Sequence, residues 1–262
     1  MPGEDRMDGR VVIVTGATSG IGAAAARLLA ARGARVVAAG RRQDRGDAVV
    51  EEIRAAGGEA VFVRADMASD ADIRRMVDTA VSTYGGLDGA FNNAGMGGQH
   101  QQLHEYTDEN WDAQIAVNLT GVYRCMKYEI AAMLESGAKR PGGAAIVNTA
   151  STLGHRASHL SGPAYTASKH AVIGLSRQAA ISYIHQNIRV NVVSPGATRT
   201  ELLEPLMAMG PEVVKQVNEI NPIGRMATAE EVAEAALFLL SDAAGMITGH
   251  ALPVDGGQLA KL

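Results

Sequence analysis

The chain has 262 residues, of which 47% are hydrophobic and 20% are charged, and its formal net charge is -4. This length and composition are those of one large α/β domain with a buried core. The negative net charge and an aromatic content of only 4% argue against a nucleic-acid binder, which usually presents a basic face or a stacking platform.

Redox and targeting signals both favour a cytoplasmic location. Cys125 is the only cysteine, so no intrachain disulfide is possible and a reducing compartment is expected. Its position favours a small buried or interface residue over a nucleophile. Residues 1–9 lack the basic start and apolar core of a secretion signal, and no apolar run approaches the ~18 residues of a membrane span. We therefore expect no membrane contact.

The first predicted strand, residues 10–15, leads into a glycine-rich turn with the spacing Gly-x-x-x-Gly-x-Gly. An alanine-rich helix follows over residues 23–32. Glycines let a backbone approach a pyrophosphate, and a helix N-terminus supplies free N–H groups. The order of strand, turn and helix therefore favours a dinucleotide site over a plain tight turn. The residues of this turn that we expect to bind cofactor are Gly16, Thr18, Ser19, Gly20, Ile21 and Gly22.

Two arginines follow the second predicted strand, residues 35–40. An NAD enzyme carries an acidic residue here that binds the adenosine ribose 2′-hydroxyl, whereas this chain has Gly40, Arg41 and Arg42. Guanidinium groups bind phosphate through paired, charge-assisted hydrogen bonds. Arg41 and Arg42 therefore favour NADP(H), whose ribose carries a 2′-phosphate. The alternative is a solvated pair at a helix start, which leaves NAD(H) possible.

The next strands place more polar residues at strand ends. A strand over residues 59–65 ends at Asp66 and Met67, where a carboxylate could accept a hydrogen bond from the adenine amine. A helix capped by Ser69 and a strand over residues 87–91 follow. This alternation predicts a parallel sheet wound on both faces, with ligands beyond the carboxyl ends of its strands. Four candidate residues fall at such ends: Gly16, Arg41, Asp66 and Asn93.

The second half of the chain continues the alternation. Residues 107–136 have helical character and contain Asn118, a mediocre helix former that indicates either a bent helix or a tolerated surface residue. Pro163 marks the start of a helix that carries Tyr165 and Lys169. The other expected elements are strands over residues 142–150, 188–193 and 251–254 and a helix over residues 228–241.

Tyr165 and Lys169 are four residues apart, so a helix places them on one face. A free tyrosine has a pKa near 10, and only about 0.1% of it is ionised at pH 7. An adjacent cation favours the phenolate, and such a tyrosine can exchange a proton with a substrate oxygen. Tyr123 and Lys127 have the same spacing, so the spacing alone does not choose between the two pairs.

The order of the motifs resembles the short-chain dehydrogenase/reductase family over nearly the whole chain. The matching segments are Thr15-Gly16-x-x-x-Gly20-x-Gly22, Asp66, Asn92-Asn93-Ala94-Gly95, Asn118, Ser151, Tyr165-x-x-x-Lys169 and Pro195-Gly196-x-x-x-Thr200. The resemblance implies one Rossmann-type domain over residues 1–262 with about seven parallel strands, and a homotetramer. It also selects Tyr165 over Tyr123, because only Tyr165 follows a strand that ends in serine.

The resemblance implies hydride transfer between NADP(H) and a carbonyl or secondary alcohol. Tyr165 would be the general acid in reduction and the general base in oxidation, and Ser151 would bind the substrate oxygen. Lys169 would lower the pKa of Tyr165 and bind the nicotinamide ribose, while Asn118 would hold a water that relays protons. Other implied cofactor contacts are Asn93, Ala94 and Gly95 on the adenosine side and Pro195, Gly196, Thr198 and Thr200 at the nicotinamide end.

Two departures from the family pattern bear on these roles. Ser151 precedes Tyr165 by 14 residues where 13 is commoner, which would point to Thr152. We keep Ser151, which follows Asn148 by three residues, and expect the extra residue in the loop over residues 155–163. Ser19 occupies a position that is often basic in NADP enzymes, so the NADP prediction rests on the two arginines.

Several questions stay open. Residues 197–226 contain a cluster of apolar residues that includes Leu202, Met207 and Met209, and they indicate a substrate lid, with core packing as the rival interpretation. His155, Arg156 and His159 could contact substrate, although loop histidines are more often solvated, and His100 with His104 forms no convincing metal set. A 3-oxoacyl thioester reductase and a non-enzymatic cofactor sensor are alternative functions. A dehalogenase-like lyase is disfavoured, because such relatives lose the glycine-rich turn.

Overall fold

A computed structural model describes residues 7–98, 101–159 and 161–261 and contains a seven-stranded parallel sheet. The sheet has the order β3-β2-β1-β4-β5-β6-β7. Its strands are β1 (Val11–Thr15), β2 (Arg35–Gly40), β3 (Glu59–Arg64), β4 (Gly89–Asn92), β5 (Ala144–Thr149), β6 (Ile188–Pro195) and β7 (Ala251–Val254). The order reverses between β1 and β4, so the polar strand ends lie around the switch point where this fold binds ligands. The predicted Rossmann-type sheet is confirmed.

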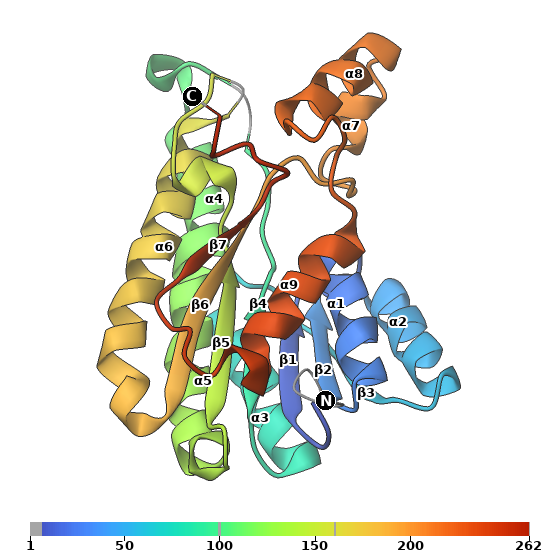
Figure 1. Ribbon diagram of the computed structural model, residues 1–262, viewed down its shortest axis with the longest axis vertical. Helices are drawn as coiled ribbons and strands as arrows, with labels where there is room; N and C mark the ends of the chain where they lie inside the picture. The colour runs from blue at the N-terminus through green and yellow to red at the C-terminus, as the bar shows by residue number, and fades with distance from the viewer. Residues whose placement is uncertain (1–6, 99–100, 160, 262) are drawn as a thin grey trace.

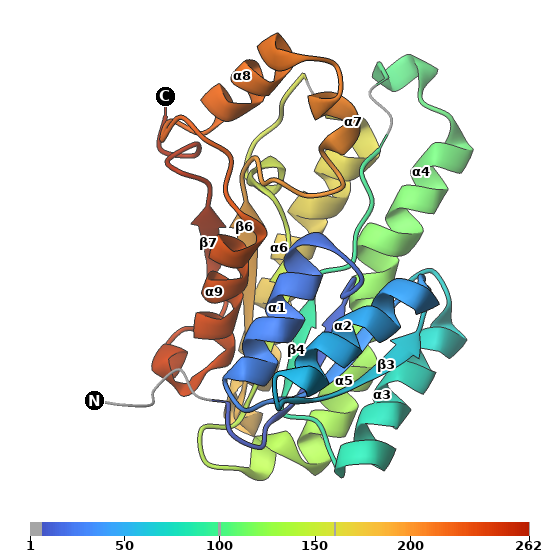
Figure 2. The same ribbon diagram turned by 90° about the vertical axis from the view of Figure 1, so that its right-hand side faces the viewer.

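Helices cover both faces of the sheet (Figures 1 and 2). On one face lie α1 (Gly20–Ala31), α2 (Gln43–Ala55) and α9 (Ala229–Leu240). On the other lie α3 (Asp70–Tyr84), α4 (Asp108–Ile115), α5 (Val122–Glu135) and α6 (Pro163–Tyr183). Each face has its own buried apolar cluster, and Cys125 lies in the second cluster as a buried residue, as predicted. Within the described ranges, no helix is long and apolar enough to cross a membrane.

Local sequence signals account for where most helices begin. The Ser69 hydroxyl accepts a hydrogen bond from the N–H of Asp72, and Thr228 forms a capping box with Glu231 at the start of α9. Pro163 opens α6, as the sequence predicts. The helix α1 begins at Gly20, three residues earlier than expected, because the turn passes directly into it.

Two short helices, α7 (Glu204–Met207) and α8 (Pro211–Ile220), stand beyond the carboxyl ends of the strands, at the top of Figures 1 and 2. They belong to the segment over residues 197–226. Leu202 and Met209 are exposed there, whereas Val217 and Met226 are buried. The segment therefore combines an anchored part with exposed apolar side chains, and its action as a lid stays a prediction.

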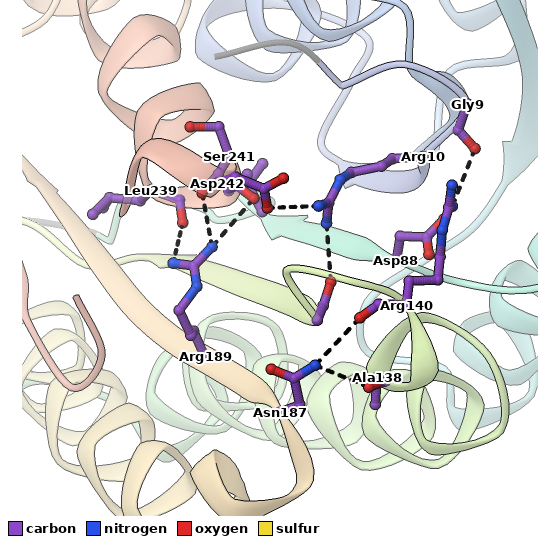
Figure 3. Close-up of polar contacts among 12 residues, drawn as sticks. Gly9, Arg10, Asp88, Ala138, Arg140, Asn187, Arg189, Leu239, Ser241 and Asp242 are labelled. Atoms are coloured by element: carbon purple, nitrogen blue, oxygen red, sulfur yellow. Dashed lines mark hydrogen bonds and ion pairs between the residues drawn. The ribbon is translucent and has the colours of Figure 1, made fainter. Parts of the chain in front are cut away.

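The opposite end of the sheet is held by buried charges, which Figure 3 shows. Arg189, on β6, donates hydrogen bonds to the carbonyl oxygens of Leu239 (2.8 Å) and Ser241 (2.9 Å), at the carboxyl end of α9. Arg10 donates to the Gly143 carbonyl and forms an ion pair with Asp242. The contacts of Arg189 satisfy carbonyl groups that a helix leaves free at its end. The negative end of the helix dipole also favours a cation at this position.

Replacing Arg189 with methionine should lower the free energy of unfolding by about 2–4 kcal/mol, because it leaves buried carbonyl groups without donors. Urea denaturation measures this change. Arg177→Met is the matched control, since Arg177 is exposed on α6. A loss below about 0.5 kcal/mol for Arg189→Met, as expected of surface substitutions, would contradict the structural role.

Candidate active site

The carboxyl edge of the sheet brings the predicted reactive side chains together. Lys169 Nζ lies 5.6 Å from the centre of the Tyr165 ring on the same face of α6. Ser151, directly after β5, lies beside the Tyr165 phenol and lowers its pKa as a hydrogen-bonding neighbour. This contact favours Ser151 over its neighbour Thr152, although both residues are buried. Tyr123, the rival tyrosine, is 48% exposed on α5.

Burial dominates the electrostatics of this pair. It lowers the pKa of Lys169 to about 8, and the ammonium donates a 2.8 Å hydrogen bond to the Thr149 carbonyl. Burial raises the pKa of Tyr165, while the hydrogen bond with Ser151 lowers it by less. The folded chain by itself thus does not depress the Tyr165 pKa as the Tyr–Lys spacing predicts. The reason is that burial disfavours the charged phenolate strongly. The Lys169 ammonium, which is directed at the Thr149 carbonyl, does not offset this effect.

Asn118 lies in a π-helical turn, Ala116–Gly121, that joins α4 to α5. This turn is the interruption that asparagine suggested in the sequence, and its wide geometry is typical of functional sites. The Asn118 side chain is fully buried, and it accepts from the Met96 N–H and donates to the Met96 carbonyl, both at 2.9 Å. A Cβ atom on Gly95 would lie 3.3 Å from Asn118 Oδ1 and 3.6 Å from Lys169 Nζ. A glycine there thus allows the loop after β4 to approach both side chains.

The glycine-rich turn after β1 fits a bound pyrophosphate. Gly16 and Gly20 have φ of +69° and +50°, and a Cβ on Gly22 would lie 2.3 Å from the Gly16 carbonyl oxygen. Side chains are therefore excluded, so the backbone is open to a ligand. Ser19 is the N-cap of α1 but makes no capping hydrogen bond, since its hydroxyl accepts from Arg42. The first N–H groups of α1 are left without a side-chain cap, which suits an anion.

Thr15 joins this turn to the segment after β4, a role that the sequence analysis did not assign. Its hydroxyl accepts hydrogen bonds from the N–H groups of Asn93 and Ala94, both at 3.0 Å. The Asn93 amide also donates to the Thr15 carbonyl at 3.2 Å. A threonine at a strand end, before glycine, was the available signal. It fixes two predicted cofactor-binding segments relative to one another.

At the adenosine end the two arginines have different surroundings. Arg41 is exposed and makes no hydrogen bond or ion pair with another described residue, and it lines a hollow together with Asp66. Arg42 donates to the hydroxyls of Ser19 (2.7 Å) and Thr18 (3.1 Å) and pairs with Glu201. The Asp66 side chain accepts from the Ala68 N–H. Met67, by contrast, is buried in the core, so only its backbone is available to a ligand.

The segment after β6 closes the other side. The Asn221 amide donates to the Ala197 carbonyl at 3.0 Å, and its oxygen lies 2.7 Å from where a Cβ of Gly196 would be. Thr198 is buried, and the Thr200 methyl would lie 3.1 Å from a Cβ on Gly20. Pro195, Gly196, Thr198 and Thr200 thus form one strap beside the glycine-rich turn. Ile21 lies in the first turn of α1, directly after Gly20.

Two side chains of the loop after Ser151 contact other parts of the chain. His155 Nε2 lies 2.9 Å from the Ser194 hydroxyl, and burial lowers the pKa of this histidine. Arg156 donates to the Gln258 carbonyl at 3.3 Å. His100 lies outside the described residues. Within the described part of the chain no group of three or more His, Cys, Asp or Glu side chains could hold a metal.

A buried polar network lies next to the site. The Asn92 amide donates to Glu129 Oε2 (2.9 Å) and to Asn148 Oδ1 (3.0 Å), and Asn148 donates to the Ser176 hydroxyl (2.9 Å). Among the described residues, Glu129 Oε1 and Asn92 Oδ1 have no hydrogen-bond partner. Burial raises the pKa of Glu129 to about 8, against the opposing effect of the Asn92 amide. If Glu129 is protonated on Oε1, this hydroxyl becomes a donor, and Asn92 Oδ1 is an acceptor without a partner among the described residues.

Comparisons with known proteins identify the class to which this fold and site belong. The family model described as enoyl-(acyl carrier protein) reductase matches residues 16–258. The chain is 43% identical to a 2,5-dichloro-2,5-cyclohexadiene-1,4-diol dehydrogenase of Sphingobium indicum, over 97% of this chain and 98% of the relative. It is 41% identical to a cyclohexanol dehydrogenase of Acinetobacter sp. (strain SE19), over 98% of both chains.

Solved structures agree with these relatives. A short-chain type dehydrogenase/reductase from Mycobacterium marinum superposes with a TM-score of 0.91 at 33% identity, over 98% of both chains. A putative 2-deoxy-D-gluconate 3-dehydrogenase from Agrobacterium tumefaciens with bound NADP gives 0.88 at 33% identity, over 98% of this chain and 99% of that one. The chain belongs to the short-chain dehydrogenase/reductase family.

Proposed function

We propose that this protein transfers a hydride between NADP(H) and a cyclic ketone or secondary alcohol. One observation carries the proposal: the Tyr165 phenol meets Ser151 and the buried Lys169 at the strand edge that also bears the glycine-rich turn. The turn excludes side chains and leaves helix N–H groups uncapped, which fits a dinucleotide. The relatives named for ring alcohols support the substrate class.

The residues of the chain supply proton transfer and positioning. In reduction, the substrate oxygen would accept hydrogen bonds from Ser151 and Tyr165, and Tyr165 would give up its proton as negative charge develops there. Lys169, mostly protonated at pH 7 with a pKa of about 8, would stabilise the resulting phenolate. The nicotinamide supplies or accepts the hydride. Asn118 would hold the loop that carries Met96 in place through two hydrogen bonds to the Met96 backbone. A relay of protons from Asn118 towards Lys169 is part of the same proposal.

A screen of nicotinamide oxidation and reduction tests the proposal. NADPH and NADH should be offered with cyclohexanones, diketones, keto-steroids, sugars and acyl thioesters, and the reverse reaction with cyclohexanols. We expect the highest kcat/KM on ring ketones or alcohols. Preferred turnover of 3-oxoacyl thioesters would instead support the second candidate, a 3-oxoacyl thioester reductase, for which the acyl-carrier description of the matched family model is the supporting observation.

The cofactor preference is proposed to depend on Arg41, whose guanidinium is free of other described partners. Arg41→Asp should move the ratio of kcat/KM for NADPH over NADH towards NADH by about 10- to 100-fold, since it replaces phosphate attraction with repulsion and offers an acceptor to a ribose hydroxyl. Steady-state kinetics with both cofactors measures the ratio. Arg177→Asp is the matched control for charge. An unchanged ratio for Arg41→Asp would refute the contact.

Two further expectations belong to this proposal. The segment over residues 197–226 would cover the substrate as a lid, which is supported by its place beyond the strand ends (Figure 2). Its exposed residues Leu202 and Met209 would offer an apolar surface to a ring. The homotetramer is expected from membership of the short-chain dehydrogenase/reductase family.

A further inference from the structure

Glu201 lies at a junction that the proposed function does not explain. It follows Thr200 in the strap after β6. Its carboxylate nevertheless bonds to side chains at the start of α2, the helix that follows β2. Glu201 Oε2 lies 2.9 Å from Arg42 Nη1, and Oε1 forms an ion pair with Arg45. The Ser19 hydroxyl is a third partner. The carboxylate thus connects the strap, the glycine-rich turn and the start of α2.

The position of this carboxylate relates directly to the adenosine ribose. In this fold, the ribose 2′ position lies between the end of β2 and the first glycine-rich turn. Arg42 comes two residues after the end of β2 at Gly40, and it bonds to Thr18 and Ser19 of the turn. Glu201 is therefore bonded to one of the two arginines that lie where a 2′-phosphate would bind.

The charge of Glu201 is retained at neutral pH. Its partial burial raises the pKa of the carboxyl, but the hydrogen bonds from Arg42, Ser19 and Arg45 outweigh that effect and lower the pKa below its ordinary value. A 2′-phosphate would meet this negative charge and would compete with it for the donors of Arg42. A 2′-hydroxyl is neutral and meets neither obstacle. The side chain is 33% exposed, so the repulsion is partly screened by solvent.

We propose that Glu201 is a specificity-determining residue that limits the preference for NADP(H) by neutralising Arg42 and repelling the 2′-phosphate. The inference rests on the proposed function as a nicotinamide-dependent enzyme. Arg41 attracts the phosphate and Glu201 opposes it, and the ratio of affinities for the two cofactors reflects their balance. Glu201 also joins the strap to the start of α2 through its ion pairs with Arg42 and Arg45.

Direct cofactor binding tests this proposal without any substrate. The dissociation constants of NADPH and NADH are measured by fluorescence titration for the full-length protein and for Glu201→Gln, which keeps the shape and removes the charge. We expect Glu201→Gln to bind NADPH about tenfold more tightly, equivalent to about 1.4 kcal/mol, with the NADH constant within about twofold of wild type. The difference should shrink in high salt, because screening weakens the repulsion.

Glu204→Gln is the matched control. Glu204 is exposed and lies three residues after Glu201. Both side chains line a hollow beside the glycine-rich turn. Only Glu201 forms ion pairs with Arg42 and Arg45 among the described residues. A NADPH/NADH ratio that is unchanged in Glu201→Gln, or that changes equally in Glu204→Gln, would overturn the role of Glu201 while leaving the proposed function intact. Failure of the wild-type protein to bind either cofactor would overturn the proposed function itself.

Discussion

Tyr165→Phe should reduce kcat by about a thousandfold and leave the dissociation constant of NADPH within about twofold of wild type. Phenylalanine keeps the ring and its packing but removes the one proton that the substrate oxygen would receive. The hydroxyl forms its hydrogen bond with Ser151, so its loss also removes a donor or acceptor at the reacting oxygen. Single-turnover kinetics on a ring ketone found by the substrate screen measures the chemical step, and fluorescence titration measures cofactor binding.

The chain contains a matched control for this substitution. Tyr123 and Lys127 repeat the spacing of Tyr165 and Lys169, but Tyr123 is 48% exposed on α5. Tyr123→Phe should therefore leave kcat within about twofold of wild type, as expected for a surface change. Activity of Tyr165→Phe within tenfold of wild type would remove Tyr165 from the mechanism. Equal losses in the two variants would point to a structural cause.

Glu129→Gln should flatten the dependence of stability on pH by several kcal/mol. The folded chain raises the pKa of Glu129 to about 8 from an ordinary 4.5, so the native state binds its proton more tightly than the unfolded state does. The corresponding stability is complete below about pH 4.5 and is lost as pH rises through about 8. Because one pKa unit is worth about 1.4 kcal/mol, the upper limit of the loss is about 5 kcal/mol.

Glutamine can reproduce the neutral acid at all pH values. Its amide nitrogen can donate to Asn92 Oδ1, which lacks a partner, and its oxygen can accept from the Asn92 amide. We therefore expect Glu129→Gln to be more stable than wild type at pH 9 and similar to it at pH 5. Urea denaturation across this range measures the difference. Glu135→Gln, a change at a largely exposed carboxylate on the same helix, is the control. Parallel curves for wild type and Glu129→Gln would show that Glu129 does not carry this proton.

Sequence order was sufficient to predict the sheet and to choose Tyr165 as the candidate tyrosine. β-branched runs and glycine-rich turns specify strands and turns through interactions between residues close in sequence. The alternation of these strands with helices then predicts a parallel, Rossmann-type sheet. Tyr165 was distinguished from Tyr123 only by the serine-bearing strand before it, and the structure places Ser151 in hydrogen-bonding contact with the Tyr165 phenol. The helical interruption at Asn118 was also suggested by residue type, because asparagine is a poor interior helix residue.

The fold, the glycine-rich turn and the candidate acid thus follow from local sequence patterns. The electrostatics of the site follow from tertiary contacts. Arg42 and Glu201 are 159 positions apart, and Glu129 on α5 meets Asn92 at the end of β4. The pKa of Tyr165 rises because of its burial, against the expectation drawn from its neighbour Lys169. Local patterns specify elements, whereas desolvation and pairing depend on which distant side chains the packed elements bring together.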